Sequence, residues 1–251
     1  MIRLRNVYKS FDSQSVLNGL DLEIPAGQIT AVIGPSGEGK SVLLKHMIGL
    51  LRPDSGEIEV DGESILNLRR SRLNRIREKF GMLFQNAALF DSMSVFENVA
   101  FPLREKTSLS RDEIEQRVRS ALEHVGLKNV NGKFPDEISG GMKKRVGLAR
   151  ALLLNPKIIL FDEPTTGLDP IICRATHQLI KDTHVRFGFT SVVVSHEIPE
   201  IFDVSDQVAM LYRGEIIEVG SPEEIQRSNH PVVRQFITGS LEGPILPIRL
   251  V

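Results

Sequence analysis

Cysteine is nearly missing from this sequence: Cys173 is the only one among 251 residues. A single cysteine excludes an internal disulfide and is typical of a reducing compartment. Long hydrophobic runs are missing too, because no stretch approaches the about 18 uninterrupted apolar residues of a membrane-spanning helix. The first residues, Met1-Ile-Arg-Leu-Arg-Asn6, lack the apolar centre of a secretory signal. We therefore expect a cytosolic protein that has any membrane role only through a partner.

Charge of one sign is not in excess either. The 31 lysines and arginines nearly balance the 32 aspartates and glutamates, so the net charge is −1. This balance gives no sign of bulk attraction to nucleic acid, and we expect no nucleic-acid partner. The six histidines show no metal-ligand spacing, and no repeat of about 20–50 residues is present. The length and a hydrophobic content of 41% indicate one large globular domain or a domain with two lobes.

The segment from Gly34 to Ser41 fits the pattern G-x-x-x-x-G-K-[ST] of a phosphate-binding loop. Its glycines let main-chain N–H groups turn toward phosphate oxygens, while Lys40 supplies positive charge and the Ser41 hydroxyl can ligate Mg²⁺. The run 29–33 predicts a buried strand before the loop, and 41–51 predicts a helix whose N-terminus favours anions. The predicted nucleotide-binding residues of this segment are Gly34, Pro35, Ser36, Gly37, Glu38, Gly39, Lys40, Ser41 and Val42.

Two further strand-like runs end in polar residues. The apolar run 158–161 is followed by Asp162 and Glu163, and the run 190–195 by His196. Such runs predict buried strands of a parallel sheet, beyond whose carboxyl ends ligands bind. Asp162 is suited to hold Mg²⁺, and Glu163 to position or deprotonate an attacking water. His196 can hydrogen-bond a γ-phosphate oxygen or that water.

A serine–glycine turn precedes another predicted helix. Ser139 is a good N-cap, and Gly140 and Gly141 permit close backbone approach at the start of the helix. A helix N-terminus of this kind is a second anion site. A chain with one phosphate loop has no obvious use for a second γ-phosphate site, but a dimer does, since each turn can cap the ATP held by the other subunit.

The remaining segments indicate an α/β fold. Alternating residues over 1–30 predict antiparallel strands with turns at 12–13 and 25–27, and 56–62 predicts a hairpin closed by Asp61-Gly62. Residues 64–79 and most of 95–153 are predicted helical, including a helix over 111–125. Strand–helix alternation over 156–231 predicts a parallel sheet. Turn-forming residues over 239–251 predict an extended tail.

These motifs together resemble the ATP-binding cassette (ABC) ATPases. Ser139-Gly-Gly-Met142 is similar to the family signature, usually L-S-G-G-Q, with Met142 in place of glutamine. Gly34–Ser41 is similar to Walker A, and 158–163 to Walker B with its catalytic glutamate. Gln85 stands where the family has its Q-loop glutamine, Gly167-Leu168-Asp169 where it has the D-loop, and His196 where it has the switch histidine. Phe11 lies where the family places an adenine-stacking aromatic; Tyr8 is the weaker candidate.

The resemblance implies a fold and a division of the chain. The fold is an α/β P-loop NTPase, an ABC cassette with a mixed, mainly parallel core sheet. An N-terminal antiparallel β subdomain and an inserted helical subdomain at about 90–155 complete it. The cassette covers 1–238, and the tail covers 239–251.

The resemblance also implies a mechanism with ATP and Mg²⁺ as cofactors. Two copies of the chain sandwich two Mg-ATP, and hydrolysis releases the dimer. Ser41, Gln85 and Asp162 are the implied metal ligands, and Lys40, Gln85, Glu163 and His196 the catalytic residues. Ser139, Gly140 and Gly141 bind the nucleotide of the second copy. A cassette that binds ATP without hydrolysing it is disfavoured, because Glu163 and His196 are both present.

The spacing between motifs narrows the class. Ser41 and Ser139 are too close for the long coiled coil of DNA-repair relatives, and translation-type relatives usually carry two cassettes. A transporter ATPase with a separate membrane permease remains, peripheral on the cytoplasmic face of the inner membrane. The string from Gln85 to Glu105 and the C-terminal string from Gln235 to Ile245 resemble the ATPases of Mla/Mce-type phospholipid transport systems, which maintain outer-membrane lipid asymmetry. In those relatives the C-terminal string reaches across to the second ATPase subunit. Ala87, Ala88, Leu89, Phe90 and Met93 are the residues predicted to line a groove for the permease.

Further partners and alternatives follow from this narrower resemblance. It implies an Mce-domain lipid-binding protein and a possible small regulatory subunit. The alternatives are the ATPase of an amino-acid or other solute importer and a non-transport ABC ATPase.

Two basic segments stay open to more than one interpretation. The run 68–79 is predicted to be a solvated helix face rather than a site for anionic headgroups. Lys143-Lys-Arg145 either attracts ATP or is surface charge.

Replacing Lys40 by alanine is expected to weaken ATP binding about tenfold or more, because a charge-assisted hydrogen bond to phosphate is lost. Titration with a fluorescent ATP analogue measures the change in Kd. Lys45→Ala, five residues further on in the predicted helix 41–51, is the control and should bind as the parent does. Unchanged affinity in Lys40→Ala would remove Lys40 from the phosphate site.

Overall fold

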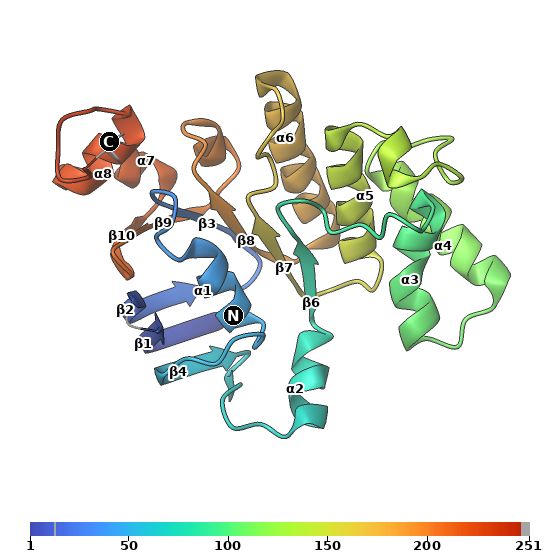
Figure 1. Ribbon diagram of the computed structural model, residues 1–251, viewed down its shortest axis with the longest axis horizontal. Coiled ribbons are helices and arrows are strands. Elements are labelled where there is room, and N and C mark those ends of the chain that lie inside the picture. Colours follow the sequence, from blue (N-terminus) through green and yellow to red (C-terminus); the bar gives the residue numbers. More distant parts are fainter. Residues whose placement is uncertain (13, 247–251) are drawn as a thin grey trace. The chain divides into compact units, whose positions relative to one another are not determined.

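The structure, a computed structural model, describes residues 1–12 and 14–246. Contacts divide the chain into two units (Figure 1), one formed by 1–73 with 194–251 and one by 74–193. The second unit is therefore a single insertion in the sequence of the first. The predicted limits of the helical subdomain, about 90–155, remain a prediction.

The first unit contains an antiparallel sheet of four strands in the order β2-β1-β4-β5. The strands are β1 (Ile2–Phe11), β2 (Gln14–Ile24), β4 (Ser55–Val60) and β5 (Glu63–Ser64). Leu4 opposes Leu22 on β2 and Ile58 on β4, and all three are buried. Alternating burial explains why the sequence predicts half-buried strands here, and the hairpin at Asp61-Gly62 is confirmed by the pairing of Val60 with Glu63.

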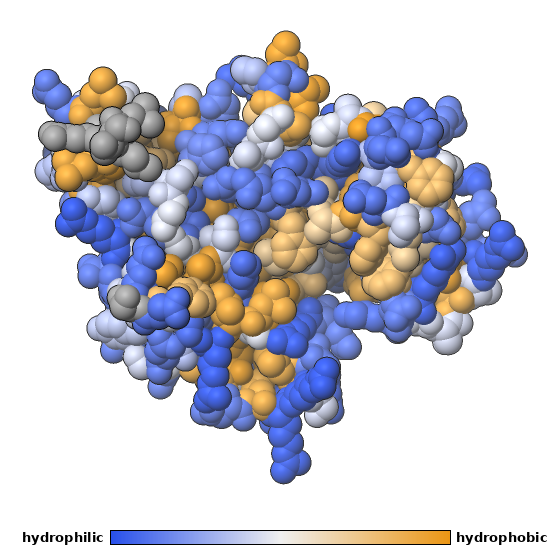
Figure 2. All heavy atoms as spheres, viewed as in Figure 1, coloured by the Kyte–Doolittle hydropathy of each residue, from blue (hydrophilic) through white to orange (hydrophobic). Residues whose placement is uncertain are grey.

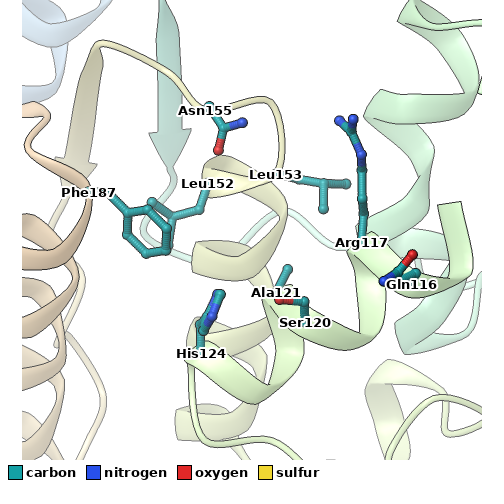
Figure 3. A pocket seen from close by; sticks show the side chains of 9 residues that line it. All are labelled: Gln116, Arg117, Ser120, Ala121, His124, Leu152, Leu153, Asn155 and Phe187. Carbon is teal, nitrogen blue, oxygen red and sulfur yellow. The ribbon is translucent and has the colours of Figure 1, made fainter. Parts of the chain in front are cut away.

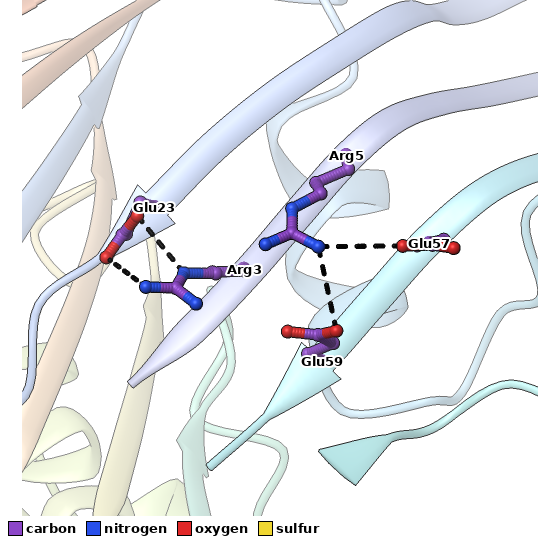
Figure 4. Close-up of polar contacts among 5 residues, drawn as sticks. All are labelled: Arg3, Arg5, Glu23, Glu57 and Glu59. Atoms are coloured by element: carbon purple, nitrogen blue, oxygen red, sulfur yellow. Dashed lines mark hydrogen bonds and ion pairs between the residues drawn. The ribbon is translucent and has the colours of Figure 1, made fainter. Parts of the chain in front are cut away.

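The outer face of the same sheet carries paired charges (Figure 4). Arg3 on β1 lies 3.2 Å from Glu23 on β2, and Arg5 on β1 lies 3.7 Å from Glu57 and 3.8 Å from Glu59 on β4. These cross-strand pairs are solvent-exposed, so each contributes little to stability. They favour the observed register, since a slip of one residue would move the arginines to the apolar face.

The first unit also contains the strands and helices around the phosphate loop. β3 (Ile29–Ile33) is parallel to β9 (Gln207–Tyr212), which pairs antiparallel with β10 (Glu215–Gly220). The helical segments are α1 (Lys40–Met47), the 3-10 turn Glu200–Asp203, α7 (Pro222–Gln226) and α8 (Pro231–Thr238). Every residue of β3 is buried, as its continuous apolar run predicts.

The second unit combines parallel strands with the long helices. β6 (Phe80–Leu83) pairs in parallel with β7 (Ile158–Asp162), and β8 (Thr190–Ser195), which begins in this unit, follows β7 in the sheet. The helices are α3 (Val95–Lys106), α4 (Arg111–His124), α5 (Gly140–Leu152) and α6 (Pro170–Phe187), with a 3-10 turn at Pro135–Glu137. Figure 1 shows α3, α4 and α5 grouped beside one another.

Local capping explains where these helices begin. Ser94 and Ser110 form capping boxes with Glu97 and Glu113 at the starts of α3 and α4. Such a cap satisfies main-chain donors that no helical carbonyl can reach. Asp169 caps α6, and Gly188 ends it with a φ of +66°. The predicted helix over 111–125 is confirmed to within one residue.

Three predictions of local structure need correction. The helix after the phosphate loop ends at Met47 rather than residue 51, because Gly49 takes a φ of +68° and turns the chain. The segment 64–79 is helical only as α2 (Arg70–Arg77). On α2 Ile76 is buried and Arg70, Arg72 and Arg75 are exposed, and Figure 2 shows hydrophilic surface over this helix at the lower edge of the view.

The third correction concerns the tail. Its described part, 239–246, is not extended but bends back on α8. The buried Gln235 side chain donates to the Ile245 carbonyl at 2.9 Å and accepts from the Ile245 N–H at 2.7 Å, and the Tyr212 hydroxyl donates to the Pro244 carbonyl at 3.1 Å. The Gln235 side chain thus satisfies both the main-chain N–H and the main-chain carbonyl of Ile245. Residues 247–251 of the predicted tail lie outside the described residues.

Gly56 and Gly62 allow a test of the close approach between β1 and β4. Both have positive φ, +98° and +77°, but only at Gly56 would a Cβ meet main chain, 2.3 Å from the Asn6 carbonyl oxygen. Gly62→Ala is expected to lose about 1 kcal/mol of unfolding free energy from backbone strain alone. Gly56→Ala is expected to lose more, because its Cβ also meets the main chain of Asn6. Urea unfolding measures both, and equal losses would contradict the close approach of these two strands at Gly56.

Candidate functional site

The phosphate loop joins β3 to α1 in the first unit. Gly34 has a φ of +151°, and a Cβ built there would lie 2.2 Å from the carbonyl oxygen of Leu211. Gly37 and Gly39 have φ values of +86° and +93°, which other residues rarely adopt. Glycine is therefore required here by backbone shape as well as by space, and the loop can present its N–H groups on its inner side.

Lys40 is buried, with 4% of its surface exposed. Its Nζ donates to the carbonyl oxygens of Gly34 and Pro35, each at 2.8 Å. The ammonium is thus held above the loop at the start of α1, where no acidic side chain occurs in the first turn. Burial lowers the pKa of His46, which lies further along the same helix. The arrangement can bind a polyphosphate.

Two more predicted residues lie in the first unit. Phe11, at the end of β1, is 41% exposed, and the Lys9 ammonium lies 5.3 Å from its ring centroid. Tyr8 is equally exposed, but its hydroxyl packs against Gly19. A Cβ built on Gly19 would lie only 2.8 Å from the Tyr8 hydroxyl oxygen. An exposed aromatic ring of this kind can stack on an aromatic base. His196 follows β8 and is exposed.

The acidic pair lies in the second unit, at the end of β7. Asp162 is 7% exposed, while Glu163 takes a φ of +46°, which turns its side chain away from the strand. Glu163 Oε2 accepts hydrogen bonds from Gln85 Nε2 at 3.0 Å and from the Thr166 hydroxyl at 2.9 Å. The structure therefore brings together Gln85 and Glu163, which are far apart in the sequence.

The signature turn begins α5 in the same unit. The Ser139 hydroxyl accepts from the Met142 N–H at 3.3 Å, which confirms Ser139 as the N-cap. A Cβ on Gly141 would lie 2.9 Å from Ile172 Cγ2, so this glycine allows α5 to lie close to α6. Ser139 to Met142 line one cavity of about 530 Å³ together with Gly167, Leu168 and Asp169, the predicted D-loop. The two motifs thus form one surface.

Sequence reasoning missed the part played by Lys144, for which it offered only attraction of ATP or surface charge. Lys144 is only 6% exposed, and its Nζ donates to the Gln85 carbonyl and lies 3.4 Å from the Glu163 carbonyl. A signal was available: Lys144 shares its helix face with Gly147 and Leu148, three and four residues on, which are also buried. A lysine on an apolar helix face needs polar partners inside the protein.

The predicted residues thus form two groups, each described within its own unit. The phosphate loop, Phe11 and His196 belong to the first unit, and Gln85, Asp162, Glu163 and Ser139–Gly141 to the second. Among the described residues, no cluster of three or more histidine, cysteine or acidic side chains could hold a metal ion. Of the predicted Mg²⁺ ligands, only Asp162 is acidic, so most of any ion's charge would be met by phosphate oxygens.

A separate pocket of about 320 Å³ lies between α4 and the ends of α5 and α6 (Figure 3). His124 and Phe187 meet there edge to face, with ring centroids 5.5 Å apart. Burial and the nearby Arg186 guanidinium lower the pKa of His124. None of the predicted site residues lines this pocket, so it is not part of the candidate site.

Comparison with known proteins defines the class. The ABC transporter family model matches residues 17–166, and the chain belongs to this family. It is 32% identical to the cassette MJ0796 in a dimeric post-hydrolysis state bound to ADP and Pi, with a TM-score of 0.81 over 88% of this chain and 99% of that one. The predicted fold class, an ABC cassette of the P-loop NTPases, is confirmed, and so is its activity as an ATP-binding ATPase.

The particular relatives are transport ATPases. The chain is 46% identical over 244 residues to the probable ribonucleotide transport ATP-binding protein mkl of Mycobacterium leprae, covering 97% of this chain and 70% of that protein. It is 42% identical over 245 residues to MlaF, the ATP-binding protein of the intermembrane phospholipid transport system of Escherichia coli, covering 98% and 91%. No described helix is long and apolar enough to cross a membrane.

Proposed function

We propose that this chain is the ATPase subunit of a phospholipid transporter and acts through a separate membrane permease at the cytoplasmic face of the inner membrane. The observation that carries the proposal is its similarity to MlaF, which extends over 91% of that protein, whereas mkl is matched over 70%. Substrate choice lies in the permease and in any lipid carrier. Those partners are proposed to be an integral permease, an Mce-domain lipid-binding protein and a possible small regulatory subunit.

In this proposal two copies of the chain act together. The exposed surface shared by Ser139–Met142 and the D-loop caps the ATP bound by the phosphate loop of the other copy. Loop N–H groups and Lys40 bind the phosphates of the chain's own ATP, and Phe11 stacks on adenine. The described part of the tail, which packs on Gln235 and Tyr212, is proposed to contact the second copy.

Mg²⁺ would be held by Ser41, Asp162 and Gln85. Ser41 is the second residue of α1, and Asp162 is a buried carboxylate at the end of β7. Hard oxygen donors of this kind fit the ion. When bound, Mg²⁺ neutralises charge on the phosphate oxygens. The Gln85 Nε2 donates to Glu163 in this structure, so Oε1 of the same amide is the atom that would ligate the metal.

Glu163 is proposed as the base that takes a proton from the attacking water. Thr166 and Gln85 hold its carboxylate in one orientation, and an oriented carboxylate can accept a proton along a defined direction. His196, exposed beyond β8, is proposed to donate to the γ-phosphate and stabilise charge as the bond to the leaving oxygen breaks.

The permease contact is proposed at the segment after Gln85. Phe90 is 43% exposed and packs against Phe101 with the rings tilted at 56° and their centroids 5.1 Å apart. Asn98, which is fully buried, holds this segment by donating to the carbonyl oxygens of Phe90 and Met93 at 3.0 Å. Ala87, one of the residues predicted to line the groove, is 1% exposed and is not available to a partner.

Glu163→Gln is expected to keep ATP binding and to lower ATP turnover about 100-fold or more, because the amide cannot accept the proton. The dimer should then persist in ATP and be visible by size-exclusion chromatography with light scattering. Glu105→Gln, on the exposed end of α3, is the matched control. Parental turnover in Glu163→Gln would remove Glu163 as the base.

The transported substrate is tested by purifying the tagged full-length chain from its own membranes in mild detergent. Mass spectrometry then identifies the retained proteins and lipids, with untagged membranes as the control. We expect a permease, an Mce-domain protein and phospholipid. A permease with a solute- or nucleotide-binding protein would overturn the phospholipid assignment, and absence of any membrane partner would overturn the role in transport.

A further inference from the structure

One face of α5 holds the loop that follows β6. Arg150 donates to the carbonyl oxygens of Ala88 at 2.8 Å and Ala87 at 2.7 Å. A Cβ on Gly147 would lie 2.6 Å from Leu83 Cδ1 and 3.3 Å from the Ala87 Cβ. Lys144, Gly147 and Arg150 are spaced three residues apart, so they lie along one side of the helix. The loop is thus fixed to the helix that begins with the signature turn.

The held loop has an unfavourable backbone. Ala87 and Ala88 have φ values of +57° and +45°, the left-handed region that costs a residue with a Cβ about 1–2 kcal/mol. Non-glycine residues stay in this region only where surrounding contacts require it. The hydrogen bonds from Arg150 and the close contact at Gly147 are such contacts, so the loop conformation depends on α5.

Lys144 joins this loop to the acidic pair. Its buried ammonium donates to the main-chain oxygen of Gln85 and lies 3.4 Å from that of Glu163. The side chains of these two residues are themselves joined at 3.0 Å. Gln85 and Glu163 are therefore connected twice, once through their side chains and once through the lysine.

We propose that Lys144 is a positioning residue for ATP hydrolysis, which holds the main chains of Gln85 and Glu163 at the separation their side chains require. The physical reason is charge. Two carbonyl oxygens that approach one point repel each other, and a cation between them turns that repulsion into attraction. The inference rests on the proposed roles of Glu163 and Gln85.

Loss of the cation should affect turnover rather than nucleotide affinity. Without it, the carbonyls separate and the Glu163 carboxylate leaves the orientation set by Gln85 and Thr166. A displaced base costs rate, because proton transfer depends on the position of the acceptor. The phosphate loop contacts of Lys40 are made within the loop itself, so they remain when Lys144 is changed.

The test compares Lys144→Met, of similar length but neutral, with Lys144→Arg, which keeps the charge. Lys106→Met, on the exposed end of α3, is the matched control. In the full-length protein we expect kcat to fall about tenfold or more in Lys144→Met, with KM for ATP and Kd for a non-hydrolysable analogue within about twofold. Arginine should restore most of kcat, and the control should match the parent.

A double-mutant cycle with Gln85→Ala tests whether Lys144 acts through the side-chain contact between Gln85 and Glu163. If it does, Lys144→Met should slow the Gln85→Ala enzyme by far less than it slows the parent. Native-state amide exchange over 84–89 supplies a readout independent of activity, and it should be faster in Lys144→Met. If that variant does not fold, Lys144→Gln takes its place under the same criteria.

Three results would overturn the proposal. The first is an unchanged kcat in a folded neutral variant of Lys144. The second is an equal loss of kcat, ATP affinity and thermal stability that Lys144→Arg does not restore. The third is that Lys144→Met and Gln85→Ala have independent effects on kcat in the double-mutant cycle. Failure of the proposed function looks different, since a parent without ATPase activity, or one in which Glu163→Gln keeps its activity, would show it. In that case amide exchange still decides whether Lys144 holds the loop.

Discussion

Burial of the parallel strands is the constraint on which the candidate site depends. β3 and β7 are buried along their whole length, so the polar groups of the site gather at and beyond their carboxyl ends. The phosphate loop follows β3, Asp162 is the last residue of β7, and Glu163 comes directly after it. The same rule therefore sets the position of the cation Lys40 in one unit and of the carboxylates in the other.

Three cations bonded to main-chain carbonyls then organise the backbone near strand ends; Lys40 and Lys144 are buried, and Arg150 is partly exposed. Lys40 is held by carbonyls of its own loop, Arg150 by carbonyls of the loop after β6, and Lys144 bonds those of Gln85 and Glu163. A buried charge is costly unless it is hydrogen-bonded, so each cation selects one loop conformation. In this way a helix that begins with the signature turn also shapes the neighbourhood of Glu163.

Much of the fold and of the site was predictable because the motifs are short and local. Glycine spacing, the serine N-cap at Ser139 and the buried runs before Asp162 each depend on a few neighbouring residues. Two of the errors arose where contacts between separate segments decide. The tail bends because Gln235 bonds Ile245, and Ala87 is buried because Gly147 lets α5 approach it.

The sequence alone was enough for the ABC family, the fold class and the identity of the phosphate-loop residues, since backbone geometry around a phosphate tolerates few residue types. Only the tertiary structure showed that the side chains of Gln85 and Glu163 are hydrogen-bonded and that Lys144 donates to the main-chain carbonyls of both. Those contacts join residues 78, 59 and 19 positions apart. No local pattern encodes such a meeting, because it requires a strand, a loop and a helix to pack at one place.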